Sequence, residues 1–249
     1  IYDPVAGGAA LVVIDMGSHV QALAVFKDPA TGEPRLACAC LNKTVRIVDP
    51  VAGGEALLVL DVDTGALVVF ADPATGAPRL ACGCHDKKVR IFDPVAGGTA
   101  LIVIDAGDCV YALAVFTDPA TGAPRLACGC DDKKVRIFDP VAGGDALLVL
   151  DIGSDLNALV VFKEPATGAP RLACGTGYGD GKVLVFDAIS GGDALLVLDV
   201  GSEVLALVAF ENLAPGALRL ASGSGDKKVC VFDPVAGGEA LVVLKGHTR

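Results

Sequence analysis

Residues 93–98 of the chain are Asp93-Pro-Val-Ala-Gly-Gly98, and this hexapeptide recurs along nearly the whole sequence. It begins at residues 3, 49, 93, 139 and 233, and the variant Asp-Ala-Ile-Ser-Gly-Gly begins at residue 187. Successive copies therefore begin 46, 44, 46, 48 and 46 residues apart. A fixed period of this length is typical of a protein built by repeating one small structural unit.

A second phrase, Asp/Glu-Pro-Ala-Thr-Gly-X-Pro-Arg-Leu, keeps the same period. It begins at Asp28, Asp72, Asp118 and Glu164, and a degraded fifth copy covers Glu211–Leu220. All nine phenylalanines occupy two positions of the repeat: Phe26, Phe70, Phe116, Phe162 and Phe210 at the first, and Phe92, Phe138, Phe186 and Phe232 at the second. The repeat therefore fixes apolar positions as well as turns.

Each period contains four short apolar runs bounded by Gly, Pro or Asp, which predicts four strands separated by turns. In the third copy these runs are Val110–Phe116, Arg125–Cys130, Lys134–Asp139 and Ala146–Leu150. Several runs are continuously apolar, which is typical of strands buried on both faces between stacked sheets. No 3.6-residue period is present, and this argues against helical repeats.

Four strands every 44–48 residues are typical of a propeller blade. We predict an all-β fold, a single β-propeller of about five four-stranded antiparallel blades that covers residues 1–249. The blades are expected at residues 20–60, 64–104, 110–150, 156–198 and 204–244, with residues 1–14 as closing or surplus strands.

The segment Cys84-His-Asp86-Lys-Lys-Val-Arg-Ile-Phe92-Asp93 resembles the end of a WD repeat, with Phe92 where that family usually has Trp. Leu244-Lys-Gly246-His247-Thr248 resembles the Gly-His that opens the next repeat. The likeness to the WD-repeat β-propeller family, with degenerate repeats, extends over essentially the whole chain. It implies protein–protein scaffolding rather than catalysis, as a fold-level analogy.

WD repeats commonly carry a buried polar network, and this chain departs from it. The opening loops, such as Asp61-Val-Asp-Thr-Gly65, lack Gly-His; Phe replaces Trp, and Cys mostly replaces Ser or Thr. Replacing several partners together by apolar atoms can be nearly neutral. We therefore expect normal blades without the network. The Asx residues of the turns, Asn42, Asp86, Asp132, Asp180 and Asp226, are expected to bond the local turn backbone.

Composition excludes several classes of protein. Hydrophobic residues make up 53% of the chain, far more than a disordered chain carries. The formal net charge of −10 argues against nucleic-acid binding through phosphate contacts. No apolar run approaches the roughly 18 residues of a membrane-spanning helix. The sequence begins at Ile1 without a signal segment, as an excised or processed piece would.

The nine cysteines are an odd number in a chain large enough to build its own core, which argues against a disulfide framework. We therefore expect an intracellular location, with the cytoplasm preferred. The pairs Cys38/Cys40, Cys82/Cys84 and Cys128/Cys130 could hold zinc together with His85. Because Thr176, Ser222 and Ser224 stand at equivalent positions, we favour small buried side chains and no metal.

Three further repeated features favour structural roles. The Lys pairs Lys87/Lys88, Lys133/Lys134 and Lys227/Lys228 fit solvated turns. The arginines that begin the second strand, Arg35, Arg79, Arg125, Arg171 and Arg219, fit a repeated ion pair with the acid of the preceding turn. The Gly-Gly steps fit tight turns rather than a phosphate cradle, since no helix follows them. No catalytic constellation is present, and we expect no cofactor.

Loop diversity on a rigid scaffold is where recognition usually lies, and the loops opposite the near-identical turns differ among copies. We predict that a protein or peptide binds there, with Tyr111 as an aromatic anchor. The predicted partner-binding residues are Gln21, Asp63, His85, Asp108, Tyr111, Asp155, Asn157, Tyr178 and Glu203. The alternatives are an engineered or purely structural repeat protein without a ligand and, less favoured, a propeller enzyme acting in the central channel.

The fourth strand of the unit occurs six times, once more than five blades require. Either Ala9–Ile14 completes the last blade and displaces Ala240–Leu244, or the C-terminal strand keeps its place. We favour closure by the N-terminal strand, because it would remove the open edge. In both cases an apolar edge strand is left over, which predicts self-association.

Overall fold

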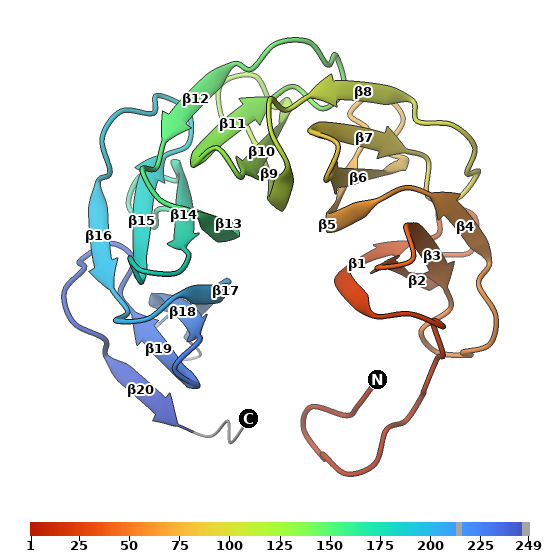
Figure 1. Ribbon diagram of the computed structural model, residues 1–249, viewed down its shortest axis with the longest axis horizontal. Helices are drawn as coiled ribbons and strands as arrows, with labels where there is room; N and C mark the ends of the chain where they lie inside the picture. The colour runs from red at the N-terminus through yellow and green to blue at the C-terminus, as the bar shows by residue number, and fades with distance from the viewer. Residues whose placement is uncertain (213–215, 246–249) are drawn as a thin grey trace. The chain divides into compact units, whose positions relative to one another are not determined.

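The structure is a computed structural model that describes residues 1–212 and 216–245. Within these residues the chain forms twenty strands in five four-stranded antiparallel sheets (Figure 1). The predicted fold class is therefore confirmed. The predicted Gly-His at Gly246-His247 lies outside the described residues, as does part of the degraded fifth turn. The chain divides into two compact units, Ile1–Val110 with Pro140–Gly143 and Tyr111–Asp139 with Gly144–Arg249.

Two sheets lie in the first unit, each with its strands in sequence order. The first sheet contains β1 (Val20–Lys27), β2 (Pro34–Cys40), β3 (Thr44–Val48) and β4 (Leu58–Asp61). The second contains β5 (Thr64–Ala71), β6 (Pro78–Cys84), β7 (Lys88–Phe92) and β8 (Ile102–Asp105).

The other three sheets belong to the second unit, except that β9 begins at Val110 of the first. The third sheet contains β9 (Val110–Thr117), β10 (Pro124–Cys130), β11 (Lys134–Phe138) and β12 (Leu148–Asp151). The fourth contains β13 (Leu156–Lys163), β14 (Pro170–Thr176), β15 (Lys182–Asp187) and β16 (Leu196–Asp199). The fifth contains β17 (Val204–Glu211), β18 (Leu218–Ser224), β19 (Lys228–Phe232) and β20 (Val242–Lys245).

The hexapeptide makes the turn between the third and fourth strands of each sheet. In the first sheet Asp49 Oδ1 accepts hydrogen bonds from the backbone N–H groups of Val51 (2.8 Å) and Ala52 (2.8 Å). Gly53 and Gly54 follow with φ values of 71° and 89°, a region that glycine enters without steric cost. The Gly-Gly step is therefore a turn, as predicted.

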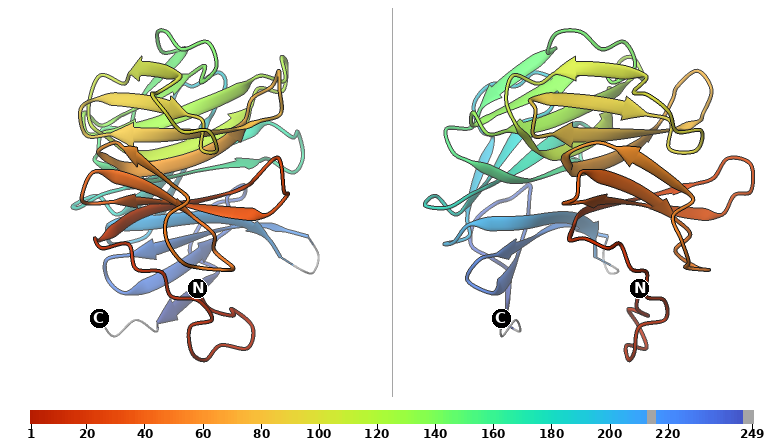
Figure 2. Two further views of the ribbon diagram at one scale, coloured as in Figure 1. Left: turned by 90° about the vertical axis from the view of Figure 1, so that its right-hand side faces the viewer. Right: turned by 45° about the vertical axis from the view of Figure 1, so that its right-hand side comes forward.

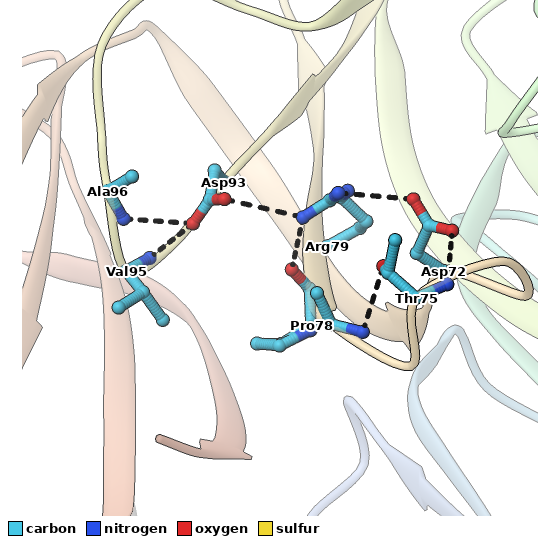
Figure 3. Close-up of polar contacts among 8 residues, drawn as sticks. Asp72, Thr75, Pro78, Arg79, Asp93, Val95 and Ala96 are labelled. Atoms are coloured by element: carbon cyan, nitrogen blue, oxygen red, sulfur yellow. Dashed lines mark hydrogen bonds and ion pairs between the residues drawn. The ribbon is translucent and has the colours of Figure 1, made fainter. Parts of the chain in front are cut away.

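The repeated arginine joins the two kinds of turn at the same end of the sheet (Figure 3). Arg79 Nη2 lies 3.1 Å from Asp72 Oδ2 in the turn after the first strand, and Nη1 lies 3.4 Å from Asp93 Oδ2 in the hexapeptide turn. The predicted pairing with the first turn is confirmed, and the second partner is an addition. In the fifth sheet Asn212 replaces the first acid, and Arg219 contacts Asp233 at 3.3 Å.

Adjacent sheets within a unit pack through one repeated arrangement of side chains. In the first unit Leu60 and Val62, at the end of the first sheet, pack against Leu80, Cys82 and Phe92 of the second. In the second unit the equivalent residues Leu150 and Ile152 pack against Leu172, Cys174 and Phe186. Leu198 and Val200 likewise pack on the fifth sheet, against Leu220 and Phe232. The core is therefore a series of sheet-to-sheet contacts.

The closure that we favoured is wrong for this structure. β20 pairs with β19, with Val229 opposite Leu244 and Val231 opposite Val242, so the C-terminal strand keeps its place. The short turn at Asp233–Gly238 holds β20 beside β19, because Asp233 Oδ1 accepts from Val235 and Ala236. Residues 9–14 form no strand, and Figure 2 shows the chain before β1 as a loop.

Candidate functional site

The predicted site residues lie at the other end of the sheets. Six are on loops: Asp63, Asp108, Asp155 and Glu203 lie just before a first strand, and His85 and Tyr178 lie between a second and a third strand. The other three, Gln21, Tyr111 and Asn157, are the second residues of β1, β9 and β13. Gln21, Asp63, His85 and Asp108 belong to the first unit. Tyr111, Asp155, Asn157, Tyr178 and Glu203 belong to the second. The structure gives one group of loops in each unit.

Asp63 and His85 are brought together in the first unit. The ring nitrogen His85 Nδ1 lies 2.9 Å from Asp63 Oδ1, and Lys43 Nζ lies 3.2 Å from Asp63 Oδ2. Hydrogen bonds from His85 and Lys43 hold the pKa of Asp63 below its ordinary value, although partial burial opposes them. The carboxylate is therefore ionised at neutral pH and fixes the relative positions of two loops from adjacent sheets.

Asp108 extends the same group of loops. Lys87 Nζ lies 3.0 Å from Asp108 Oδ1, and Cys109 Sγ donates to the backbone oxygen of His85 at 2.9 Å. These contacts link the loop after β6 to the loop before β9. Gln21, in contrast, is an exposed residue of β1.

A β-bulge occurs at the second residue of the first strand in several sheets. The register between first and second strands shifts between Val20 and Ala22, and again between Leu156 and Ala158. Gln21 and Asn157 are therefore extra residues without a partner position in the ladder. Bulges of this kind re-aim a side chain, and the same register shift occurs in the second and fifth sheets, at Gly65 and Leu205.

The loop between β14 and β15 contacts two predicted residues of the second unit. The N–H of Gly177 donates to the backbone oxygen of Asp155 at 2.7 Å. A Cβ atom at Gly177 would lie 3.1 Å from Asp155 Cβ and 3.4 Å from Asn157 Nδ2. The glycine therefore allows this loop to lie directly on the start of β13.

Tyr178 follows in that loop and is 88% exposed. Together with Gly179, Asp180 and Gly181 it borders a hollow of about 250 Å³, whose other side is formed by residues 201–203, including Glu203. Gly181 has a φ of 63°, and a Cβ atom there would lie 2.7 Å from the N of Ser202. The hollow thus depends on a glycine-rich loop that no other copy of the repeat has.

Three contacting lysines were not assigned to this site from the sequence. Lys43, Lys87 and Lys133 adopt positive φ values of 65°, 69° and 63°. Their ammonium groups contact Asp63, Asp108 and Asp155, the last pair at 3.8 Å, rather than the turn Asn or Asp directly before each lysine. In the sequence these Lys–Asp contacts are indicated by a lysine that recurs after the turn Asx and by an acid in the opening loop that follows.

The cysteine pairs lie inside the sheets. Eight of the nine thiols are buried, and Cys109 is partly exposed. Burial raises the pKa of Cys38 to about 11 and raises that of Cys82 and Cys128 well above the ordinary value. Within the described residues, no three His, Cys, Asp or Glu side chains form a group that could hold a metal ion. Such thiols behave as small apolar side chains.

Comparisons with known proteins bear on the fold. No family model matches the chain, and no curated protein sequence matches it. A search of solved structures finds 1170 matching chains, so the fold is widely used. One of them, in the crystal structure of a mitotic checkpoint complex, has a TM-score of 0.70 at 19% identity. The match covers 100% of this chain and 72% of that one, and it supports an all-β propeller fold with five four-stranded blades.

Proposed function

We propose that the chain is a non-catalytic interaction module that binds a protein or peptide through its variable loops. Support comes from the contrast between the two ends of the sheets. At one end, repeated Arg–acid contacts such as those of Arg79 join near-identical turns. At the other end, the loops differ in length and in side chains. Loops that vary on a repeated scaffold are the usual place for recognition.

The observation that carries this proposal is the loop of Tyr178 in the second unit. Tyrosine is enriched among residues that dominate binding energy, and this ring is 88% exposed beside a hollow of about 250 Å³. Asp155 and Glu203 lie on the neighbouring loops, which makes the surroundings acidic. The arrangement fits a peptide segment that carries an apolar side chain next to a basic one.

Tyr111 is the second aromatic residue of this unit on a predicted binding position. Its side chain is 44% exposed at the second residue of β9. A tyrosine buries a large area with few rotatable bonds, so partial exposure leaves contact area for a partner. The loops of the first unit, around Asp63 and His85, offer charged groups already held by neighbouring side chains.

The test is a selection of peptides from a displayed random library on the purified chain, followed by affinity measurements on the selected sequences. Tyr178→Ala or Tyr111→Ala should weaken binding by at least about 1 kcal/mol, roughly fivefold, if these residues are hot spots. Replacing residues 176–181 by the equivalent residues 84–87 should have a larger effect.

The matched control is the opposite end, where the exposed residues Pro119, Ala120 and Thr121 are all replaced by serine. This change should leave the affinity unchanged. Equal losses from the loop swap and from this change would show that the wrong end was chosen. Failure to select any binding peptide would favour the alternative, a purely structural repeat protein.

The proposed absence of catalysis follows from the residues at the strand starts. A propeller enzyme would need carboxylates or histidines at these positions, where the chain has Gln21, Tyr111, Asn157 and Leu205. An intracellular location and the absence of nucleic-acid and membrane partners are part of the same proposal. Residues 1–212 and 216–245 contain no helix with the length and apolar character needed to cross a membrane.

A further inference from the structure

The N-terminal segment packs on the first sheet as the outer strand of a preceding sheet would. Ile14 and Met16 pack against Cys38, Cys40 and Val48. Ile14 and Met16 are the repeat equivalents of Leu60 and Val62, which pack against Cys82, Cys84 and Phe92 in the same way. The outer part of the first sheet is therefore covered, although the segment that covers it pairs with no sheet.

The inner strand of the first sheet lacks such cover. Val20, Leu23 and Val25 of β1 are 43%, 59% and 65% exposed. Val204 of β17, the equivalent of Val20, is fully buried in the fourth-to-fifth-sheet contact. Leu207, the equivalent of Leu23, is also packed in that contact. The exposed face of β1 therefore corresponds to the face of β17 that, within the second unit, is covered by the fourth sheet.

The fifth sheet also has an uncovered face. Phe210 is 42% exposed and Leu244 is 55% exposed. Their equivalents in the fourth sheet, Phe162 and Leu198, are 5% and 0% exposed, because the fifth sheet covers them. The uncovered face of the fifth sheet therefore carries the same side chains with which the fourth sheet contacts β17. The uncovered face of β1, which is equivalent to that of β17, is complementary to it.

The outer strand of the fifth sheet also carries a charge mismatch. In the other four sheets the residue opposite the start of the third strand is aspartate, as where Asp105 faces Lys88 and Asp199 faces Lys182. In the fifth sheet Lys245 faces Lys228, whose ammonium group also contacts Asp226 of the preceding turn. Like charges directly opposite each other in a sheet are destabilising. Asp15 is the repeat equivalent of Lys245 and would restore the usual pair.

We propose that the chain self-associates by strand exchange with a second copy. Residues 11–15 of one copy pair with β19 of the other in place of β20, with Asp15 opposite Lys228. The exchange brings Val208 and Phe210 of one copy onto Leu23 and Val25 of the other. It buries both uncovered faces and removes the Lys–Lys pair at the same time.

Strand exchange is required because two segments compete for one place. Ile14 and Met16 already occupy the outer position on the first sheet, where Leu244 would lie if the fifth sheet docked with β20 attached. The connection from Met16 to β1 is short, so the N-terminal segment stays with its own first sheet. The partner's fifth sheet must therefore give up β20. A second copy can supply a fifth sheet without β20, and its exposed face with Val208 and Phe210 is complementary to β1.

The first experiment is zero-length carbodiimide cross-linking of an equal mixture of isotope-labelled and unlabelled chain. It joins a carboxylate and an amine in contact with loss of water. We expect a cross-linked peptide pair that contains Asp15 and Lys228, with one labelled and one unlabelled partner. The contact between Lys87 and Asp108, at 3.0 Å, is the positive control.

Two results would overturn the proposal. One is an Asp15–Lys228 cross-link found only between peptides of the same label, which would mean closure within one chain. The other is the absence of this cross-link while Lys87–Asp108 is found.

The second experiment follows the concentration dependence of the mass in solution by analytical ultracentrifugation. Lys245→Asp gives β20 the residue that the other outer strands have, so it should strengthen β20 in place and weaken self-association at least tenfold. Since this change favours the folded monomer, loss of association cannot reflect unfolding. Unchanged association, or a wild-type chain that stays monomeric, contradicts the proposal.

A third variant tests the docked faces. A Cβ atom at Gly175 would lie 2.6 Å from Val204 of the next sheet, whereas at Gly223 the nearest atom is 3.8 Å away. Val20 of a second copy would take the place of Val204 against Gly223. Gly223→Ala should therefore reduce association while the monomer stays folded, and full association of this variant would exclude the proposed docking.

Discussion

Arg90 donates two hydrogen bonds to the carboxylate of Asp86, at 2.8 and 2.7 Å, across the turn between β6 and β7. Arg136 and Asp132 repeat this contact at 3.0 and 2.6 Å. We expected the turn Asx residues to bond the backbone, and in these two copies they mainly bond an arginine of the third strand. The reason is geometric, because a guanidinium four residues on can engage both carboxylate oxygens.

The first sheet has the arginine without the acid. Arg46 is the equivalent of Arg90, but Asn42 stands in place of Asp86, and Arg46 Nε is buried without a hydrogen-bond partner among the described residues. Asn42→Asp should give the Arg46 guanidinium a carboxylate equivalent to the one that Nη1 and Nη2 of Arg90 bond, and it should raise stability by about 0.5–1 kcal/mol. Thermal unfolding measures this, and Asp132→Asn is the matched control that should lower the midpoint. Equal midpoints for Asn42→Asp and wild type would contradict the prediction.

The same carboxylates predict a loss of stability in acid. Hydrogen bonds from the arginines hold the pKa of Asp86 and Asp132 below the ordinary value of 3.8. As the pH falls below that value, the unfolded chain takes up protons before the folded chain does. The stabilisation is therefore complete above about pH 4 and is lost as the pH falls through the lowered values.

Unfolding midpoints between pH 2 and pH 7 test this dependence. The wild-type midpoint should fall steeply below pH 4, and the variant with Asp86→Asn and Asp132→Asn should fall less. Parallel curves for the two proteins would mean that these carboxylates do not contribute to the acid sensitivity.

Thiol reactivity should separate one cysteine from the other eight. Cys109 is partly exposed, whereas the others are buried and several have raised pKa values, so they form little thiolate. At pH 8 a thiol reagent should modify one group per folded chain quickly, and Cys109→Ser should remove that phase. A fast phase that involves several thiols would show that the sheets open readily.

The paired replacement Cys82→Ser with Cys84→Ser should leave the fold intact. Serine already occupies the equivalent positions Ser222 and Ser224, which are 0% and 8% exposed in the fifth sheet. Circular dichroism and elemental analysis provide the measurement. Stoichiometric zinc in the wild type that disappears in this variant would refute the packing role.

The strands and turns were predictable because each recurs at a fixed spacing and depends on local chemistry. The partners of Arg79 show which contacts the sequence does not predict. Asp72 is near Arg79 in the sequence, so that pair could be predicted. Asp93 becomes a neighbour of Arg79 only when β7 pairs with β6. The bridge from Lys87 to Asp108 has the same origin, since it joins two loops from different sheets.

The placement of the N-terminal segment was not predictable from strand counting. Covalent continuity keeps β20 beside β19 despite the Lys228–Lys245 mismatch, and the sequence alone gives no measure of these opposing effects. The bulge at Gln21 was also missed, because no residue type marks it: Gln21, Asn157 and Leu205 share the position without sharing any chemistry.

A last prediction concerns the glycine that the second strand has in every sheet but the first, where Ala39 stands instead. At Gly175 a methyl group would meet Val204 Cγ1 at 2.6 Å, so Gly175→Ala should cost about 1–3 kcal/mol by overpacking the contact between the fourth and fifth sheets. At Gly223 the nearest atom is 3.8 Å away and φ is not positive, so Gly223→Ala should be neutral or stabilise by up to about 1 kcal/mol. Denaturant unfolding of both variants in the Lys245→Asp background keeps self-association out of the comparison. Equal losses at the two sites would mean that glycine is required there by the backbone rather than by the packing of the next sheet.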